Sequence, residues 1–248
     1  MTIVAAFGRR YLPSGWRDLG RQLVIWFGFA LAYQVARGLA DRSATQAFEN
    51  GLAVIDIESR FNALFELSLQ RLVDSPGFLT ALAGWTYWLS QFSVVGLAVL
   101  WVYFRRHESF TRFRNVILLT NVLGLVGYVL LPTAPPRMFP TIGFMDTLAA
   151  YGSIEHESGV VQLAANPYAA MPSLHAADAL IVGVALAVLV RRRILKALWL
   201  AWPAWVWFCV MATGNHFWLD VAAGILVAAV AALVIYGPPL RRRPLPAT

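Results

Sequence analysis

Charged residues are scarce in this sequence of 248 residues. Asp, Glu, Lys and Arg make up 13% of the chain, whereas apolar residues make up 59%. A soluble globular domain usually has about 25% charged residues and a smaller apolar share. The shortage of charge therefore excludes an ordinary soluble domain and indicates an integral membrane protein.

Cysteine and lysine are nearly absent. Cys209 is the single cysteine, which excludes an intrachain disulfide and leaves the redox compartment open. Lys196 is the one lysine among 20 basic residues, a bias that, with abundant alanine, is typical of a GC-rich bacterial genome. The sequence also lacks internal repeats, low-complexity linkers and a cleavable secretory signal. We therefore expect one domain over residues 1–248, with its first hydrophobic span retained.

Six apolar stretches have close to the ~20 residues that a helix needs to cross a bilayer. They are residues 22–39, 79–104, 115–132, 174–190, 195–212 and 217–236. Pro203 and several tryptophans occur in the fifth stretch, but membrane helices tolerate proline and tryptophan favours the interface. The predicted fold class is all-α: a polytopic membrane protein with a bundle of six transmembrane helices.

The basic residues are distributed unevenly around these six stretches. One set of connecting segments and termini holds 15 of the 20 basic residues: Arg9, Arg10, Arg17, Arg21, Arg105, Arg106, Arg112, Arg114, Arg191, Arg192, Arg193, Lys196, Arg241, Arg242 and Arg243. Because basic loops are retained in the cytoplasm, we expect both termini there, in a bacterial plasma membrane. The net charge of +7 then reflects topology and contact with anionic lipid rather than a nucleic-acid partner.

Residues 42–75, between the first two stretches, have apolar residues at helical spacing mixed with charged ones. This pattern predicts a helix or a pair of short helices on the outer membrane surface. Glu58 or Glu66 could meet hydroxyl groups of a lipid headgroup there. The alternative, which the pattern favours, is a scaffold whose charges face water.

Polar residues that can do chemistry gather on the side opposite the basic loops. His175 begins the fourth stretch in "NPYAAMPSLHAADAL", Arg137 follows the third in "LLPTAPPR", and His216 and Asp220 stand at the start of the sixth in "ATGNHFWLD". With six spans, all four face the extracytoplasmic side. Ionisable groups in or beside membrane spans are energetically costly. We therefore expect Asp220 either to take part in catalysis or to tie two helices together as a buried partner.

The spacing of His216 and Asp220 indicates a nucleophile or base. Positions four apart share a helix face, so the carboxylate can orient one ring nitrogen and leave the other aimed outward. His175 could then protonate a leaving oxygen, although a single histidine near a helix end is more often an interfacial residue. Arg137 offers a planar fork for phosphate, beside the hydroxyl of Ser173 and the free N–H groups where the fourth span begins.

Other residues near these motifs could bind a headgroup or serve the structure. Asp178, one turn below His175, could bind a sugar or inositol hydroxyl or pair with a neighbouring span. Asn215 and Tyr168 could also contact the headgroup, but a turn and an interfacial anchor explain them equally well. The loop "IEHES" does not place its polar residues on one face, so we expect no metal there and no cofactor.

The motifs "LPTAPPR", "MPSLHAA" and "GNHFWLD" resemble those of the type 2 phosphatidic acid phosphatase superfamily, in particular the branch of inositol phosphorylceramide synthase. The segment "AVIDIESRFNALFELSLQRLV" resembles the paired short helices of that branch. The resemblance implies metal-independent phosphoryl transfer through a phosphohistidine. In it, His216 attacks phosphorus, Asp220 orients His216, His175 protonates the departing alkoxide and Arg137 binds the phosphate.

The sequence departs from the phosphatase pattern where a lysine, a Ser-Arg pair and a glycine are usual. Leu130, Cys209, Val210 and Leu174 occupy those positions. A phosphodiester carries one negative charge and needs fewer cations than a phosphomonoester, so the pattern favours headgroup transfer from a phospholipid donor to a lipid or glycan hydroxyl. A lipid or polyprenyl phosphatase is the alternative. A transporter or channel is disfavoured because no inverted repeat or paired half-helix is visible.

Overall fold

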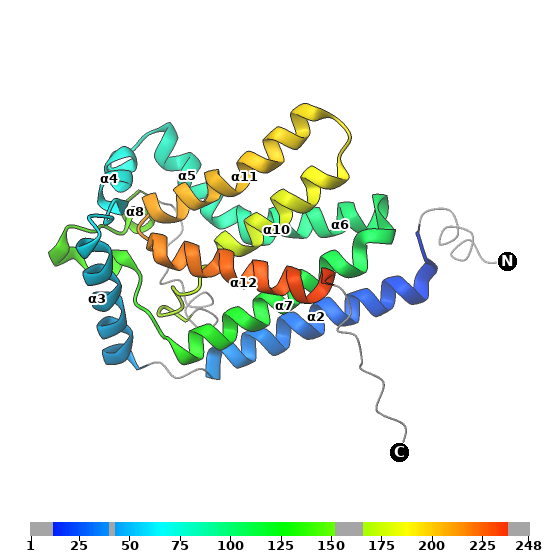
Figure 1. The fold of residues 1–248 in the computed structure, drawn as a ribbon, viewed down its shortest axis with the longest axis horizontal. Helices are drawn as coiled ribbons and strands as arrows, with labels where there is room; N and C mark the ends of the chain where they lie inside the picture. The colour runs from blue at the N-terminus through cyan, green and yellow to red at the C-terminus, as the bar shows by residue number, and fades with distance from the viewer. Residues whose placement is uncertain (1–11, 40–42, 152–165, 238–248) are drawn as a thin grey trace, which may run out of the picture.

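A computed structural model describes residues 12–39, 43–151 and 166–237, which form a bundle of helices without a β-strand (Figure 1). The α-helices are α2 (Gly15–Leu39), α3 (Ala44–Arg60), α4 (Glu66–Gln70), α5 (Phe78–Leu89), α6 (Val95–Arg105), α7 (His107–Leu130), α8 (Thr147–Tyr151), α10 (Leu174–Leu189), α11 (Arg193–Ala212) and α12 (Trp218–Tyr236). A π-helical turn, Ser90–Val94, joins α5 to α6. The predicted all-α class is confirmed.

Four helical stretches are long and apolar enough to cross a membrane: Phe78–Arg105, His107–Leu130, Arg193–Ala212 and Trp218–Tyr236. The apolar helix α10 is shorter, with 16 residues. The 25-residue α2 is long enough but carries Arg17, Asp18 and Arg21 in its first turns. The chain is therefore an integral membrane protein, as predicted, while the count of six spans stays a prediction.

Helix α10 is the centre of the bundle, and Figure 1 shows it between α11 and α12. Small residues let its neighbours approach closely, as is common where helices pack in membranes. A Cβ atom added to Gly183 would lie 2.6 Å from the carbonyl oxygen of Trp199 on α11, and one added to Gly224 on α12 would lie 2.2 Å from that of Ser173. The start of α10 is thus held firmly against α12.

Helix α3 runs across the end of the bundle at which α12 begins (Figure 1). Its buried face, with Val54 and Ile55, packs against Phe139 and Phe217. The helix is fastened further by Asn50, whose side-chain amide donates to the carbonyl oxygen of Pro132 (2.7 Å). Two short helices, α3 and α4, therefore occupy the segment for which the sequence predicts them; their place on a membrane surface stays a prediction.

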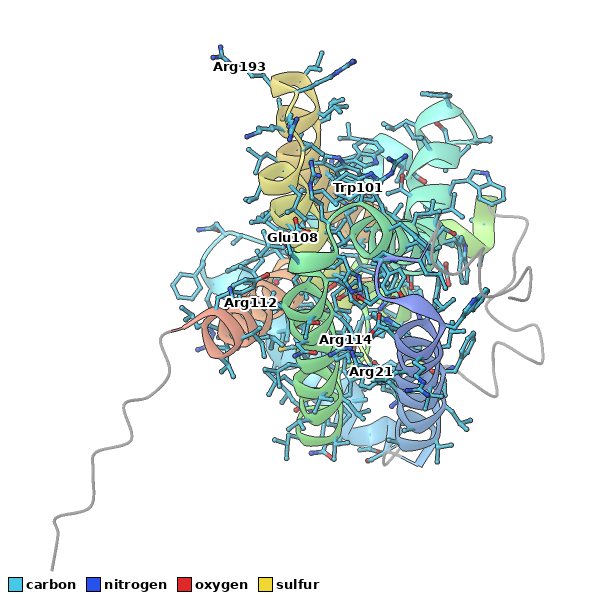
Figure 2. All side chains as sticks on the ribbon, turned by 90° about the vertical axis from the view of Figure 1, so that its right-hand side faces the viewer. Arg21, Trp101, Glu108, Arg112, Arg114 and Arg193 are labelled. Carbon is cyan, nitrogen blue, oxygen red and sulfur yellow. The ribbon has the colours of Figure 1, made fainter. Side chains whose placement is uncertain are left out.

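The arginine-rich turns lie at the opposite end of the bundle. They join α6 to α7 and α10 to α11, and Figure 2 looks onto this end, with Arg21, Arg112 and Arg193 labelled. The guanidinium of Arg106 donates to the carbonyl oxygen of Leu189 (3.2 Å), at the C-terminus of α10. A cation at this position also suits the negative end of the helix dipole.

Candidate active site

Two histidines far apart in the sequence meet at the end of the bundle that α3 covers. The rings of His175, at the start of α10, and His216, in the turn before α12, have centroids 5.9 Å apart. The close packing of α10 on α12 at Gly224 brings them together. This geometry agrees with the expectation that both histidines lie on the same side of the membrane.

Asp220 lies behind the ring of His216. The Nδ1 atom of His216 is 3.4 Å from Oδ2 of Asp220, and the two side chains are almost completely buried. The expected contact is present, but its cause differs from the predicted helix face, because α12 begins only at Trp218. The carboxylate instead caps the helix: its Oδ2 accepts the backbone N–H of Phe217 (2.8 Å) and so reaches the residue that precedes the helix.

The turn that carries His216 has a fixed backbone. The N–H groups of Asn215 and His216 both donate to the carbonyl oxygen of Val210 (3.1 Å each), where α11 ends. Gly214 has φ +72°, and a Cβ atom there would lie 2.7 Å from the carbonyl oxygen of Met145. Glycine is required at this position for both reasons. The side chains of Val210 and Cys209, which replace the usual Ser-Arg pair, are fully buried.

Arg137 lies against the same turn. Its backbone N–H donates to the carbonyl oxygen of Gly214 (2.8 Å), and its Nη1 donates to Oδ1 of Asn215 (2.6 Å). Its Nε is 3.6 Å from a carboxylate oxygen of Asp146. Asn215, predicted to contact a headgroup, here orients the guanidinium of Arg137. Asp146 was not predicted from the sequence. Its one indication there is that it is an acidic residue in the same loop as Arg137.

His175 is held by the first turn of α10 and by a ring from α5. Ser173 is the N-cap residue of α10: its hydroxyl oxygen accepts the N–H of Ala176 (3.3 Å), and its own N–H donates to the carbonyl oxygen of Asp220 (2.9 Å). The ring of Tyr87 stacks on His175 with centroids 4.5 Å apart and an interplanar angle of 17°. Tyr87 was not predicted from the sequence, because it lies 88 positions before His175 along the chain.

A family profile covers most of this chain, the candidate active site included. The profile of the PAP2 superfamily matches residues 52–234, which is more than half of the chain and includes His175, His216, Asp220 and Arg137. The chain belongs to the PAP2 superfamily. This is the type 2 phosphatidic acid phosphatase superfamily that the three motifs resemble, so that prediction is confirmed.

A curated relative of this PAP2 protein is a phosphoinositol dihydroceramide synthase from Bacteroides thetaiotaomicron. The two are 32% identical over 143 residues, which is 52% of this chain and 47% of the relative. The chain thus aligns with about half of the relative's length. No solved structure matches the chain.

Two glutamates of this PAP2 protein correct an expectation from the sequence. Glu58 on α3 and Glu66 on α4 do not face water, because both are fully buried. Oε1 of Glu58 accepts the backbone N–H of Leu219 (3.2 Å), and Oε1 of Glu66 accepts that of Trp218 (2.6 Å). Burial raises the pKa of both carboxyl groups, and the charge of Glu66 raises that of Glu58 further, to about 9. Their predicted headgroup contact stays a prediction.

Asp178 and Tyr168, two other residues predicted for the headgroup, have partners on neighbouring helices. Asp178 is buried and accepts a hydrogen bond from Asn121 of α7 (3.3 Å). This contact agrees with one of the two roles expected for Asp178, the pairing with a neighbouring span. The ring of Tyr168 packs edge-on against Phe48 of α3. The loop "IEHES" lies outside the described residues, and within those residues no group of three His, Cys, Asp or Glu side chains is placed to hold a metal ion.

Proposed function

We propose that this PAP2 protein is a membrane phosphotransferase that moves a phospho-headgroup from a phospholipid to the hydroxyl of a lipid or glycan. The observation that carries the proposal is the pairing of His175 and His216, 5.9 Å apart, with Asp220 behind one ring and Arg137 on the same turn. Two imidazoles and a guanidinium at one partly buried site suit a phosphoryl group.

In the first step, Nε2 of His216 attacks phosphorus, because Nδ1 faces Asp220. A P–N bond forms, the P–O bond to the lipid alcohol breaks, and His175 gives its proton to the departing oxygen. Asp220 stabilises the positive charge that develops on the ring of His216. Arg137, oriented by Asn215 and Asp146, binds the phosphoryl oxygens.

In the second step, the acceptor hydroxyl gives its proton to His175, its oxygen attacks phosphorus and the P–N bond breaks. Both histidines then return to their starting states. The buried, uncharged side chains of Cys209 and Val210 leave fewer cations for a dianionic monoester, which supports a diester donor over a phosphatase substrate. The name of the relative supports phosphoinositol as the headgroup.

The proposal includes six membrane spans, with α2, the continuous α5–α6 stretch, α7, α10, α11 and α12 crossing the bilayer. His175 lies at the start of α10 and His216 just before α12, and Figure 1 shows that α12 starts at the end of the bundle away from the arginine-rich turns. Since such turns stay in the cytoplasm, the site opens at the extracytoplasmic face and both termini are cytoplasmic. Helices α3 and α4 then lie at the outer surface.

The test is single-turnover transfer by the purified full chain in proteoliposomes. Phospholipids labelled in the phosphate, phosphatidylinositol among them, are mixed with protein, and label on the protein and in the products is followed. We expect acid-labile label on the wild-type chain and none on His216→Ala, whereas His175→Ala should slow its formation. Unchanged turnover by His216→Ala would overturn the proposal; release of label to water alone would make the enzyme a phosphatase.

A further inference from the structure

Two buried polar side chains of α4 lie four positions apart and so share one face of this short helix. Glu66 and Gln70 are both almost fully buried, at 0% and 4% exposure. Burying polar side chains is costly unless they are hydrogen-bonded, so two of them on a five-residue helix need an explanation. Their partners belong to two different segments of the candidate active site.

Glu66 holds the segment that carries His216. Its Oε1 accepts the N–H of Trp218 at 2.6 Å, one residue before the N–H that Glu58 accepts and two residues after His216. The three N–H groups at the start of α12 are thus accepted by Asp220, Glu66 and Glu58. The first N–H groups of a helix have no partner within the helix, so the side-chain oxygens that accept them fix the first turn in place.

Gln70 holds the segment that carries the partner of Arg137. Its amide nitrogen donates to the carbonyl oxygen of Met145 (2.5 Å) and to the hydroxyl of Thr147 (3.1 Å). Its amide oxygen accepts the N–H of Met145 (3.0 Å). Asp146, which pairs with Arg137, lies between these two residues. The position of that carboxylate is therefore set by the side chain of Gln70.

The two segments also touch at Gln70. A Cβ atom added to Gly214, two residues before His216, would lie 2.9 Å from the amide nitrogen of Gln70 and 2.7 Å from the carbonyl oxygen of Met145. The turn that carries His216 and the loop that carries Asp146 therefore both contact the side-chain amide of Gln70. A helix outside the bundle reaches both halves of the site at once.

We propose that Glu66 and Gln70 are positioning residues that hold the nucleophile His216 and the phosphate-binding Arg137 at a fixed separation. This inference rests on the proposed function. Glu66 acts through the start of α12, and Gln70 acts through Asp146. Because a displacement of about 1 Å can reduce a rate by about 100-fold, loss of either contact should weaken binding of a phosphoryl group without unfolding the chain.

The test measures binding of orthovanadate, which mimics a phosphoryl group in transfer and needs no knowledge of the lipid donor. The variants Gln70→Met and Glu66→Met keep the size of each side chain and remove its hydrogen bonds. We expect the Kd for orthovanadate to rise by about 10-fold or more in each. Glu66→Gln keeps an acceptor for Trp218 and should stay within about 3-fold of the wild type.

The control is Glu49→Gln, which changes an exposed glutamate on α3 and should leave the Kd unchanged. A second signature separates positioning from simple stability. Gln70→Met and Asp146→Asn act through the same guanidinium, so their effects on the Kd should not multiply in the double variant. Thermal unfolding of the same samples establishes that each variant is folded.

Wild-type affinity in folded Gln70→Met and Glu66→Met would overturn the inference. If Gln70→Met fails to fold, Thr147→Val decides the role of Gln70, because it removes one acceptor of the Gln70 amide; an unchanged Kd there would also overturn the inference. The proposed function is tested separately. Full turnover by His216→Ala would overturn it, whatever affinity the α4 variants have. If His216→Ala is inactive and the α4 variants bind orthovanadate as tightly as the wild type does, only the positioning role is overturned.

Discussion

Oδ2 of Asp220 lies 3.4 Å from Nδ1 of His216 while it also accepts the backbone N–H of Phe217. One oxygen thereby lies beside the ring and caps the helix that follows it. The cap of α12 and the contact with the imidazole therefore depend on the same carboxylate oxygen.

Asp220→Asn should keep the fold and lose the reaction. The amide oxygen of asparagine can still accept the N–H of Phe217, but it cannot stabilise the positive charge that develops on His216. By analogy with other carboxylate–histidine pairs, the rate should fall by about 10²–10⁴-fold. The measurement is the single-turnover rate of labelling of the protein, with circular dichroism as the check of folding; a rate within a few-fold of the wild type would contradict the role of Asp220.

Arg137→Lys should impair activity although it keeps the positive charge. Lysine lacks the planar fork that Asn215 and Asp146 orient in the native protein, so its ammonium group cannot bind two phosphoryl oxygens in a fixed geometry. We expect kcat/KM to fall by about 100-fold, or about 2.7 kcal/mol. Arg112→Lys, at the exposed opposite end of the bundle, is the control and should have no effect (Figure 2).

Gly224→Ala should destabilise the bundle at the site. The added methyl group would lie 2.2 Å from the carbonyl oxygen of Ser173, and backbone at that distance has to move. Overpacking of this kind typically costs about 1–3 kcal/mol. The measurement is the Tm in detergent.

Gly96→Ala is the matched control for Gly224→Ala. A Cβ atom on Gly96 in α6 has no neighbour within 4 Å, so alanine should leave the Tm unchanged or raise it slightly. Equal Tm values for the two alanine variants would show that α10 and α12 are not packed as closely as described.

Stability should fall as the pH rises, in part because of Glu58. Burial and the nearby Glu66 raise the pKa of Glu58 to about 9 in the folded protein, from 4.5. The folded state then holds this proton more tightly than the unfolded state does. The stabilisation is complete below about pH 4.5 and is lost as the pH rises toward about 9. Glu58→Gln removes this dependence, so its Tm between pH 5 and 9 should vary less than that of the wild type; identical slopes would contradict the prediction.

Several site residues could be found from the sequence because polar residues stand out among apolar ones. His175, Arg137 and the pair His216 and Asp220 each interrupt or border a long apolar stretch, and their motifs match the superfamily. Their contacts within a few residues, such as the pairing of Asp220 with the turn before it, follow from short-range spacing. The roles assigned to these residues in catalysis stay predictions.

Contacts between distant segments could not be found in this way. Tyr87 on His175, Asp146 on Arg137 and Gln70 on Met145 join positions that no spacing rule connects. Glu58 and Glu66 show the consequence most clearly. The amphipathic pattern of their segment suggested charges in water, yet the tertiary structure buries both because the start of α12 supplies N–H groups to receive them.

The sequence by itself determined that this is a helical membrane protein of the PAP2 superfamily, because long apolar stretches and local motifs need no knowledge of distant neighbours. The tertiary structure alone decided which side chains orient the histidines and the arginine. Close packing of small residues between helices brings those partners into contact, and that packing depends on the whole bundle rather than on any one stretch of chain.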